Sequence, residues 1–384
     1  MKKSTQLNRV VQVCTGYPPD RIGGVENIVK SLSENMNQHG FKCITITRLW
    51  KRQIYNSKII QVRTPSHEAI GYVVWAVKAL ALIRKLKPNI VHCHGLEGAI
   101  LCILLYPTKI KRVMHIHNSV TREPGYEKTL SHRLGLFILR TAVTLANISI
   151  CPTFASKNDL RKYMSEEIMN KVIVVPNFAQ EPLPVSEGEI QEIKNKYELS
   201  NKKIILYFGK IKSTKGIENI CKAYRIMSLR QESRLVLAGM PTATDRFMNR
   251  LKNDYPEVIL TGYVNNPSVF YKIADVFCIY TTSFSGGETF ALSLAEAMRH
   301  GVPIVASDNQ IYREVANNLA LYAEPNNPID LARLLDFVLK NGETIHGNVI
   351  KAKRYADNVY NERNFVRSIL TIYKWSLRQN NHII

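Results

Sequence analysis

The stretch from Thr281 to Ser307 constrains the fold of this chain more than any other. It follows the apolar run Val276 to Tyr280 and opens with a polar turn at Ser285-Gly286-Gly287. An apolar run closed by a glycine turn is typical of a buried parallel strand and the loop at its carboxyl end. Residues Leu292 to His300 have helical periodicity, and the apolar run Ile304 to Ala306 follows them. The stretch therefore predicts a strand, a glycine loop, a helix and a second strand.

Two carboxylates, Glu288 and Glu296, bracket this loop and helix. Eight helical steps span roughly 12 Å, so the pair is too far apart to share one proton or one metal ion, but it could hold two ends of an elongated ligand. The backbone N–H groups between them, at a helix start, suit a phosphate; they belong to Thr289, Phe290, Ala291 and Leu292. A nucleotide sugar fits this pattern. The alternative is that Glu288 caps the helix and Glu296 is a solvated helix residue.

The residues around the two carboxylates carry a family resemblance. Glu288 to Met298, followed by His300 to Ser307, resembles the donor-site signature of the retaining glycosyltransferases of family four, which have the GT-B fold. The resemblance implies that Glu288 contacts the donor sugar and Glu296 the ribose. Ala291 departs from it, because the family usually has glycine there, so the backbone would approach the ligand less closely. The resemblance covers nearly the whole chain and is strongest between residues 204 and 314.

A basic glycine loop follows the predicted strand Ile204 to Phe208. Gly209 permits a close backbone approach, and the cations Lys210 and Lys215 could neutralise a diphosphate leaving group. The family favours arginine at the first cation; Lys210 keeps the charge but loses the bidentate fork. Lys215 matches the family. Without Glu288 downstream, a merely solvated basic loop would be the default interpretation.

The chain begins with a related pattern. The predicted strand Arg9 to Cys14 leads to Gly23 and Gly24, and a helix follows. A strand that feeds a Gly-Gly turn and a helix is a phosphate-cradle arrangement, although a plain tight turn explains it as well. The resemblance implies that Gly23 and Gly24 face the donor phosphates and the acceptor cleft.

Two His-x-His pairs lie on the predicted strands Ile90 to His94 and Val113 to His117. Alternate residues of a strand share a face, which suggests a zinc site. We predict no metal there, because no cysteine or carboxylate lies beside the pairs at convincing ligand spacing. The resemblance instead implies that His117, at a strand end, lies beside the donor sugar as part of the catalytic site. His94 has a weaker claim to the cleft.

Composition limits the class of protein. The chain has 45% hydrophobic and 22% charged residues, which is ordinary for a soluble globular protein. Its seven cysteines include no CxxC pair, so a disulfide framework or a zinc ribbon is not expected. The N-terminus has no sustained apolar core that would make it a secretory signal, and no apolar run approaches the ~18 residues of a membrane span. These features predict a cytoplasmic protein.

The net charge of +21 is unevenly distributed. Residues 1–180 hold 26 Lys and Arg against 10 Asp and Glu, whereas residues 181–384 hold 26 against 21. A basic first half suggests an anionic partner, namely a membrane surface, a lipid-phosphate acceptor or a nucleic acid, but it is also compatible with an ordinary solvated surface. Residues 109–140 combine cations with apolar residues, as in a helix that lies on an anionic membrane or one that packs into a core.

The fold prediction is two Rossmann-like doubly wound α/β domains facing a cleft. Residues 1–178 form the acceptor-side domain, 188–361 form the nucleotide-sugar-binding domain, and Ala179 to Gly188 form a linker. The resemblance implies that the C-terminal helix, at about residues 362–384, can pack back on the first domain.

The function prediction is a retaining, hexosyl-type glycosyltransferase that uses a nucleotide-sugar donor and a glycan or lipid-linked acceptor. It needs no cofactor and no metal ion, because two lysines and backbone N–H groups would stabilise the diphosphate. The resemblance implies a lipid-linked or envelope glycan as acceptor, and with the basic first half this makes an anionic membrane on the inner face the expected partner; nucleic acid is not expected. The alternative is a non-catalytic sugar-nucleotide-binding subunit of a membrane-associated glycan assembly. A nucleotide-sugar epimerase agrees less well with the donor motif.

Overall fold

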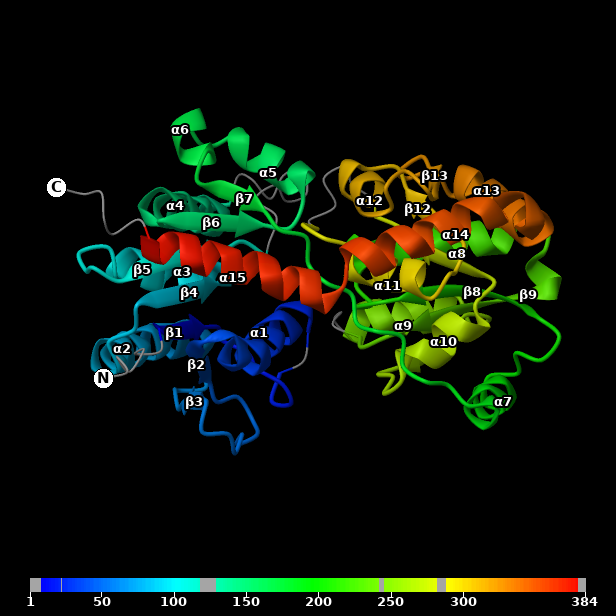
Figure 1. Cartoon of the computed structure of the whole chain (residues 1–384). Coiled ribbons are helices and arrows are strands. Elements are labelled where there is room, and N and C mark those ends of the chain that lie inside the picture. The colour runs from blue at the N-terminus through cyan, green and yellow to red at the C-terminus, as the bar shows by residue number, and fades with distance from the viewer. Residues whose placement is uncertain (1–7, 22, 118–128, 242–244, 282–287, 379–384) are drawn as a thin grey trace. The chain divides into compact units, whose positions relative to one another are not determined.

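The computed structural model describes residues 8–21, 23–117, 129–241, 245–281 and 288–378 (Figure 1). The chain divides into two compact units, one made of Met1–Asn177 with Glu362–Ile384, the other of Phe178–Asn361. Each unit is built on its own sheet, and all strand pairs in both sheets are parallel. The predicted fold of two doubly wound α/β domains is confirmed.

Unit one contains a seven-stranded sheet in the order β3-β2-β1-β4-β5-β6-β7. Its strands are β1 Asn8–Val13, β2 Phe41–Arg48, β3 Ile59–Val62, β4 Ile90–His94, β5 Lys111–His115, β6 Ile148–Cys151 and β7 Val172–Val174. Its described helices are α1 Gly24–Asn35, η1 Met36–His39, α2 Glu68–Leu86, α3 Gly95–Leu104, α4 Leu130–Leu145, α5 Phe154–Arg161, α6 Glu166–Met169 and α15 Glu362–Arg378.

Unit two contains a six-stranded sheet in the order β10-β9-β8-β11-β12-β13. Its strands are β8 Lys203–Phe208, β9 Ser233–Ala238, β10 Ile259–Gly262, β11 Val276–Ile279, β12 Ile304–Ser307 and β13 Leu321–Ala323. Its described helices are α7 Glu187–Lys196, η3 Ser213–Lys215, α8 Ile217–Ile226, η4 Arg230–Glu232, α9 Asp245–Asp254, α10 Pro267–Ile273, α11 Leu292–Arg299, α12 Gln310–Val315, α13 Pro328–Lys340 and α14 Gly342–Val359.

The central strands are short apolar runs because helices cover both faces of a parallel sheet. Every residue of β4, β11 and β12 is buried. In each sheet the strand order reverses direction at one point, between β1 and β4 in unit one and between β8 and β11 in unit two. Ligands of open α/β sheets bind at the carboxyl ends of the strands beside such a switch point. The topology therefore directs attention to the loops that follow these four strands.

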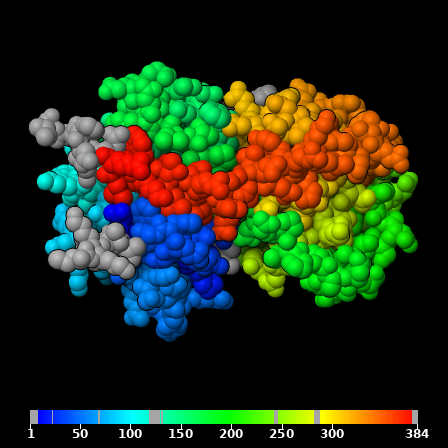
Figure 2. All heavy atoms as spheres, in the orientation of Figure 1, coloured from blue at the N-terminus to red at the C-terminus, as the bar shows by residue number. Residues whose placement is uncertain are grey.

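Helix α15 returns to the first sheet. The ring of Tyr373 lies 5.6 Å from that of Phe41 in an edge-on contact, and its hydroxyl lies 2.7 Å from Nδ1 of His92. The apolar face of α15 is buried at Phe365, Ile369 and Tyr373. The outer side of the helix forms part of the surface of unit one (Figure 2, red).

The segment expected to be a linker, Ala179 to Gly188, is instead bonded to unit two. The N–H of Ala179 donates to the carbonyl of Tyr360 at 2.9 Å, and the N–H of Leu183 donates to Oγ of Ser268, also at 2.9 Å. The C-terminal part of the segment enters α7, which Ser186 and Glu189 begin with a reciprocal capping box. Its prolines and acidic residues suggested a linker because the sequence does not show these distant bonds.

The basic segment 109–140 is not one helix, since β5 occupies Lys111–His115 and α4 begins at Leu130. Its apolar residues have two different environments: Leu136, Ile138 and Leu139 pack against the core of unit one, whereas Leu134 and Phe137 are 56% and 66% exposed. Core packing thus accounts for only part of the apolar stripe.

All seven cysteines are buried, and none of them forms a disulfide, as expected without a disulfide framework. None of the helices within the described ranges has both the length and the apolar character needed to cross a bilayer.

Candidate functional site

The loop after β8 is shaped by glycines at the switch point of unit two. Gly209 has φ of +151°, and its N–H donates to the carbonyl of Ala238 at 3.0 Å. Gly216 has φ of +61°, and a Cβ placed there would lie 2.9 Å from the ring of Tyr280. A side chain at Gly216 would therefore be strained and would collide with the end of β11. Glycine at this position lets the basic loop lie against the loop that follows β11.

The ion pair between Lys215 and Glu288 joins these two loops. Nζ of Lys215 contacts Oε1 of Glu288, and the side chains are 17% and 21% exposed. Burial, with added repulsion from Lys212 and Lys210, lowers the pKa of Lys215 to about 7. The carboxylate of Glu288, in direct contact with Nζ, favours the charged form of Lys215. Lys210 is exposed, and its carbonyl accepts a hydrogen bond from the Tyr207 hydroxyl at 2.9 Å.

The residues after Glu288 lead into the N-terminus of α11. Thr289, Phe290 and Ala291 are buried, and the ring of Phe290 packs edge-on against Tyr360 at 5.2 Å. Ala291 occupies the N-cap position without a side-chain hydrogen bond, and Leu292 is the first helical residue. No cap side chain competes for the first amides of α11, so these amides are suited to an anion beside Lys215. The preceding turn at Ser285-Gly286-Gly287 lies outside the described residues.

Glu296 projects from the second turn of α11 and is held by Tyr271 of α10. The hydroxyl of Tyr271 lies 3.1 Å from Oε2 of Glu296 and 3.2 Å from the carbonyl of Ser293. Burial raises the pKa of Glu296 to about 7, while the hydrogen bond from Tyr271 acts in the opposite direction. The imidazole of His300 stacks on the ring of Tyr271 at 4.6 Å. Glu296 is thus a positioned carboxyl group and not an ordinary solvated helix residue.

In unit one, the glycine turn after β1 surrounds a carboxylate. Gly23 is the N-cap residue of α1 and Gly24 its first residue, and no side chain caps this helix. A Cβ at Gly23 would lie 2.5 Å from Oε2 of Glu26, and one at Gly16 would lie 2.6 Å from Oε1. Glu26 also pairs with Arg21 at 3.4 Å. The glycines therefore make room for the Glu26 carboxylate, which would repel a phosphate placed in the same turn.

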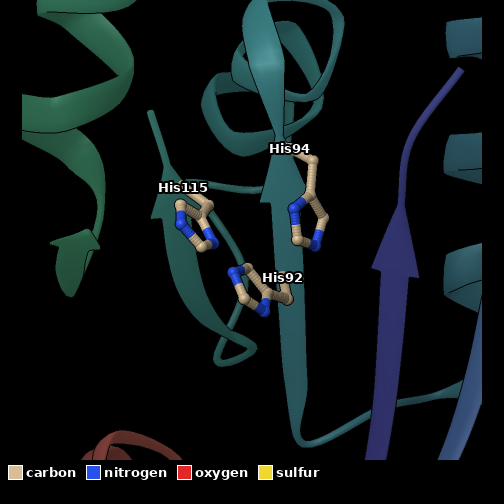
Figure 3. A group of neighbouring side chains, drawn as sticks. All are labelled: His92, His94 and His115. Atoms are coloured by element: carbon tan, nitrogen blue, oxygen red, sulfur yellow. The ribbon is translucent and has the colours of Figure 1, made fainter. Parts of the chain in front are cut away.

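His117 lies just past the end of β5, and its Nε2 is 3.0 Å from Nδ1 of His94. Burial lowers the pKa of His117 to about 3, so its imidazole is neutral at physiological pH. It adjoins the three buried histidines that Figure 3 shows on β4 and β5, His92, His94 and His115, which belong to one face of the sheet.

The structure brings some predicted site residues together. Lys215 touches Glu288, the amides of Thr289 to Leu292 follow directly, and Glu296 lies on the same helix. Gly23, Gly24 and His117 belong to unit one. Sequence reasoning missed Tyr271 and Glu26. Tyr271 lies in an apolar helical segment, where an aromatic residue is usually part of the core. Glu26 lies in the first turn of a helix, where an acidic residue is common, so the sequence indicates no site role for either residue.

Sequence profiles of two protein families match the chain. Residues 189–361 match the family described as glycosyl transferases group 1, and residues 22–180 match glycosyltransferase family 4. The first match covers nearly all of unit two, and the second covers most of unit one.

Relatives of known sequence are similar over most of their length. An uncharacterized glycosyltransferase of Methanocaldococcus jannaschii is 24% identical over 95% of this chain and 98% of its own. The alpha-monoglucosyldiacylglycerol synthase of Acholeplasma laidlawii is 21% identical over 94% of this chain and 95% of its own. An O-antigen chain mannosyltransferase of Escherichia coli is 26% identical over 52% of this chain and 60% of its own.

Solved structures share the fold. A sucrose-phosphate synthase from Thermosynechococcus elongatus has a TM-score of 0.83 at 17% identity, covering 97% of this chain and 100% of its own. An Anabaena protein in complex with UDP and glucose has a TM-score of 0.78 at 12% identity, covering 96% of this chain and 99% of its own. The architecture of this chain is the GT-B fold.

Proposed function

Because its two units match the profiles of glycosyl transferases group 1 and glycosyltransferase family 4, we propose that the chain is a retaining, hexosyl-type transferase of family four that uses a nucleotide-sugar donor. The observation that carries this proposal is the contact between Lys215 and Glu288 where two loops meet at the switch point of unit two. A nucleotide sugar needs a cation for its diphosphate and an acceptor for its sugar hydroxyls, and this pair supplies both. The Anabaena structure with UDP and glucose gives independent support for a donor of this class.

We assign a role to each group along the donor. Lys215 and Lys210, with the first amides of α11, stabilise the negative charge that builds up on the diphosphate as the bond to the sugar breaks. Glu288 accepts hydrogen bonds from the sugar hydroxyls, and Glu296 accepts them from the ribose. Donor binding exchanges the contact between Lys215 and Glu288 for one between Lys215 and the diphosphate.

No divalent cation is required in this scheme, because lysines and backbone amides carry out charge neutralisation. The acceptor is a glycan or lipid-linked glycan presented at the inner face of an anionic membrane. The names of the glycolipid synthase and the O-antigen mannosyltransferase among the relatives support an acceptor of this class.

The test is a panel of nucleotide sugars offered to the full chain with candidate acceptors, with release of the nucleoside diphosphate measured. Glu288→Gln is expected to abolish most of the transfer while the protein stays folded, because Glu288 lies in the loop and not in the core. Wild-type turnover by a folded Glu288→Gln protein would contradict the assignment. Nucleotide binding without turnover for every donor and acceptor would instead indicate a non-catalytic subunit.

The same assay tests the metal requirement. Transfer is expected to persist after treatment with EDTA and to gain nothing from added Mg²⁺ or Mn²⁺. Loss of transfer that either of these two ions restores would show that a cation, and not the lysines, neutralises the diphosphate.

A further inference from the structure

Four imidazoles lie on one face of the first sheet, and we call His92, His94, His115 and His117 the histidine cluster. The rings of His92 and His94 stack with centroids 4.2 Å apart, and those of His115 and His117 with centroids 4.1 Å apart. His94 and His115 are partners in the parallel pairing of β4 with β5, so the two stacks lie next to each other. Figure 3 shows the three fully buried members turned toward a common space.

The histidine cluster leaves buried nitrogens without partners. Within the described part of the chain, Nε2 of His92 and both ring nitrogens of His115 make no hydrogen bond, and both residues are fully buried. An unsatisfied buried polar group costs about 1–3 kcal/mol, and native proteins keep very few of them. A single bound ion could satisfy Nε2 of His92 and one of the two nitrogens of His115.

The surrounding hydrogen bonds orient lone pairs toward this space. The amide nitrogen of Gln12 donates to the carbonyl of Val29, so its Oε1 is the atom that accepts a hydrogen bond from Nε2 of His94, 3.2 Å away. A neutral His94 with its proton on Nε2 has a lone pair on Nδ1. Similarly, a hydrogen bond from Nδ1 of His92 to the Tyr373 hydroxyl, at 2.7 Å, leaves the lone pair on Nε2. Metal-binding histidines are typically held by hydrogen bonds of this kind from the second nitrogen.

We propose that the histidine cluster binds one divalent transition-metal ion of the zinc type, with His92, His94 and His115 as ligands. One nitrogen from each of these residues can be chosen so that all three lie within 4.8 Å of one another. A tetrahedral zinc ion with Zn–N bonds of about 2.0–2.1 Å would bring them to roughly 3.3 Å, so the stacked imidazoles would have to rotate about their side-chain bonds to direct their lone pairs at the ion. A purely imidazole site favours zinc, copper or nickel over magnesium or calcium.

His117 is placed to complete the coordination, since its Nε2 is already 3.0 Å from Nδ1 of His94. The ion would then cross-link the carboxyl ends of β4 and β5 under α15, whose Tyr373 holds His92. This is a structural role that does not depend on the glycosyl-transfer proposal, and coordination by His117 would replace the donor-sugar contact that the family resemblance implies for that residue.

The experiment uses the full chain without a histidine tag. The protein is unfolded in guanidinium with a chelator, dialysed and refolded with or without Zn²⁺, because a buried site fills most readily during folding. We expect about one Zn²⁺ per chain after gel filtration and a higher Tm for the loaded protein. Refolding with Co²⁺ is expected to give the strong visible absorption of a tetrahedral nitrogen site.

His115→Phe is the test variant, since phenylalanine keeps a flat ring but has no ligand atom. It is expected to lose the bound Zn²⁺, the Co²⁺ absorption and the Tm gain, while the metal-free variant is at least as stable as metal-free wild type. His39→Ala, which removes an exposed histidine of the same unit, is the matched control and is expected to bind like wild type. Stoichiometry near zero in the wild type, or equal Zn²⁺ binding by wild type and His115→Phe, would overturn the proposal. The former result would indicate that water fills the cluster.

Discussion

Among single residues, Lys215 has the most specific role in the proposed site, because it is the largely buried cation of the loop after β8. Lys215→Ala is expected to lower kcat/KM by about 30- to 900-fold, which corresponds to the roughly 2–4 kcal/mol lost with one preorganised anion-stabilising group. The measurement is steady-state transfer with the donor that the panel identifies.

The matched control for Lys215 is Lys222→Ala, which removes an exposed lysine from α8 in the same unit. This variant is expected to keep kcat/KM within about twofold of the wild-type value. If Lys215→Ala behaves like this control, the leaving group is neutralised elsewhere.

The pH dependence of donor binding should report on Glu296, whose pKa is raised from 4.5 to about 7. Below pH 7 the carboxyl group holds a proton and is a weaker acceptor for ribose hydroxyls, so nucleotide affinity is expected to rise between pH 6 and pH 8. Ionising the buried carboxyl also costs stability, so its contribution to folding falls as the pH rises from about 4.5 to 7. Titration calorimetry with the nucleoside diphosphate tests the affinity. Glu296→Gln is expected to flatten this profile, and an unchanged slope in the variant would assign the titration to another group.

Of the elements, α11 depends on a buried arginine at its C-terminal end. Arg299 is 4% exposed, donates to the carbonyl of Ala179 at 2.7 Å, and pairs with Glu181 at 2.7 Å and Asp357 at 3.2 Å. Arg299→Met keeps the apolar stem but leaves the Ala179 carbonyl without this donor, so we expect unfolding free energy to fall by about 1–3 kcal/mol. Urea unfolding followed by circular dichroism measures the change.

Arg333→Met provides the comparison for Arg299. Arg333 is 70% exposed and pairs with Asp330 on its own helix, so its removal is expected to cost no more than about 0.5 kcal/mol. Equal effects of the two substitutions would show that Arg299 does not fix the segment after residue 178 to α11.

The strands at the centre of each sheet could be predicted from the sequence because their signals are local. The apolar runs at β4, β8 and β11 are bounded by turns, and the structure confirms them within one residue. The contact of Lys215 with Glu288 was not predicted, because the residues lie 73 positions apart and the family resemblance only assigns both to one donor. From the sequence Arg299 would be predicted to be a surface cation, because the residues next to it in the chain do not indicate the carbonyl and carboxylates that surround it in the structure.

The histidines show that a visible local pattern does not reveal contacts between distant residues. Their alternation on two strands was visible, but the sequence could not show that β4 and β5 are neighbours or that Gln12 and Tyr373 orient the rings. The expectation of no metal ion rested on the absence of cysteine and carboxylate ligands, whereas imidazoles from adjacent strands can form a site without either.

At the scale of the whole molecule, charge and exposed apolar surface coincide on unit one. Residues 1–180 carry 26 Lys and Arg against 10 Asp and Glu. On α4, the exposed side chains of Arg133, Leu134, Phe137 and Arg140 recur at helical spacing, and we call them the α4 surface. Exposed apolar side chains between cations are typical of a helix that lies on an anionic bilayer.

We therefore predict reversible binding of the full chain to anionic vesicles through the α4 surface. Each cation near the bilayer contributes about 1 kcal/mol, weakened by salt, and inserting a Phe or Leu side chain adds roughly 1.5–3 kcal/mol. The double substitution Leu134→Ser with Phe137→Ser should thus weaken binding at least about tenfold in vesicle sedimentation at low ionic strength. Ile329→Ser, at a 73% exposed position of unit two, is the control and should bind like wild type. Equal binding to neutral and anionic vesicles, or none to either, would favour a soluble acceptor, whereas unchanged binding of the double variant would place the contact on another surface.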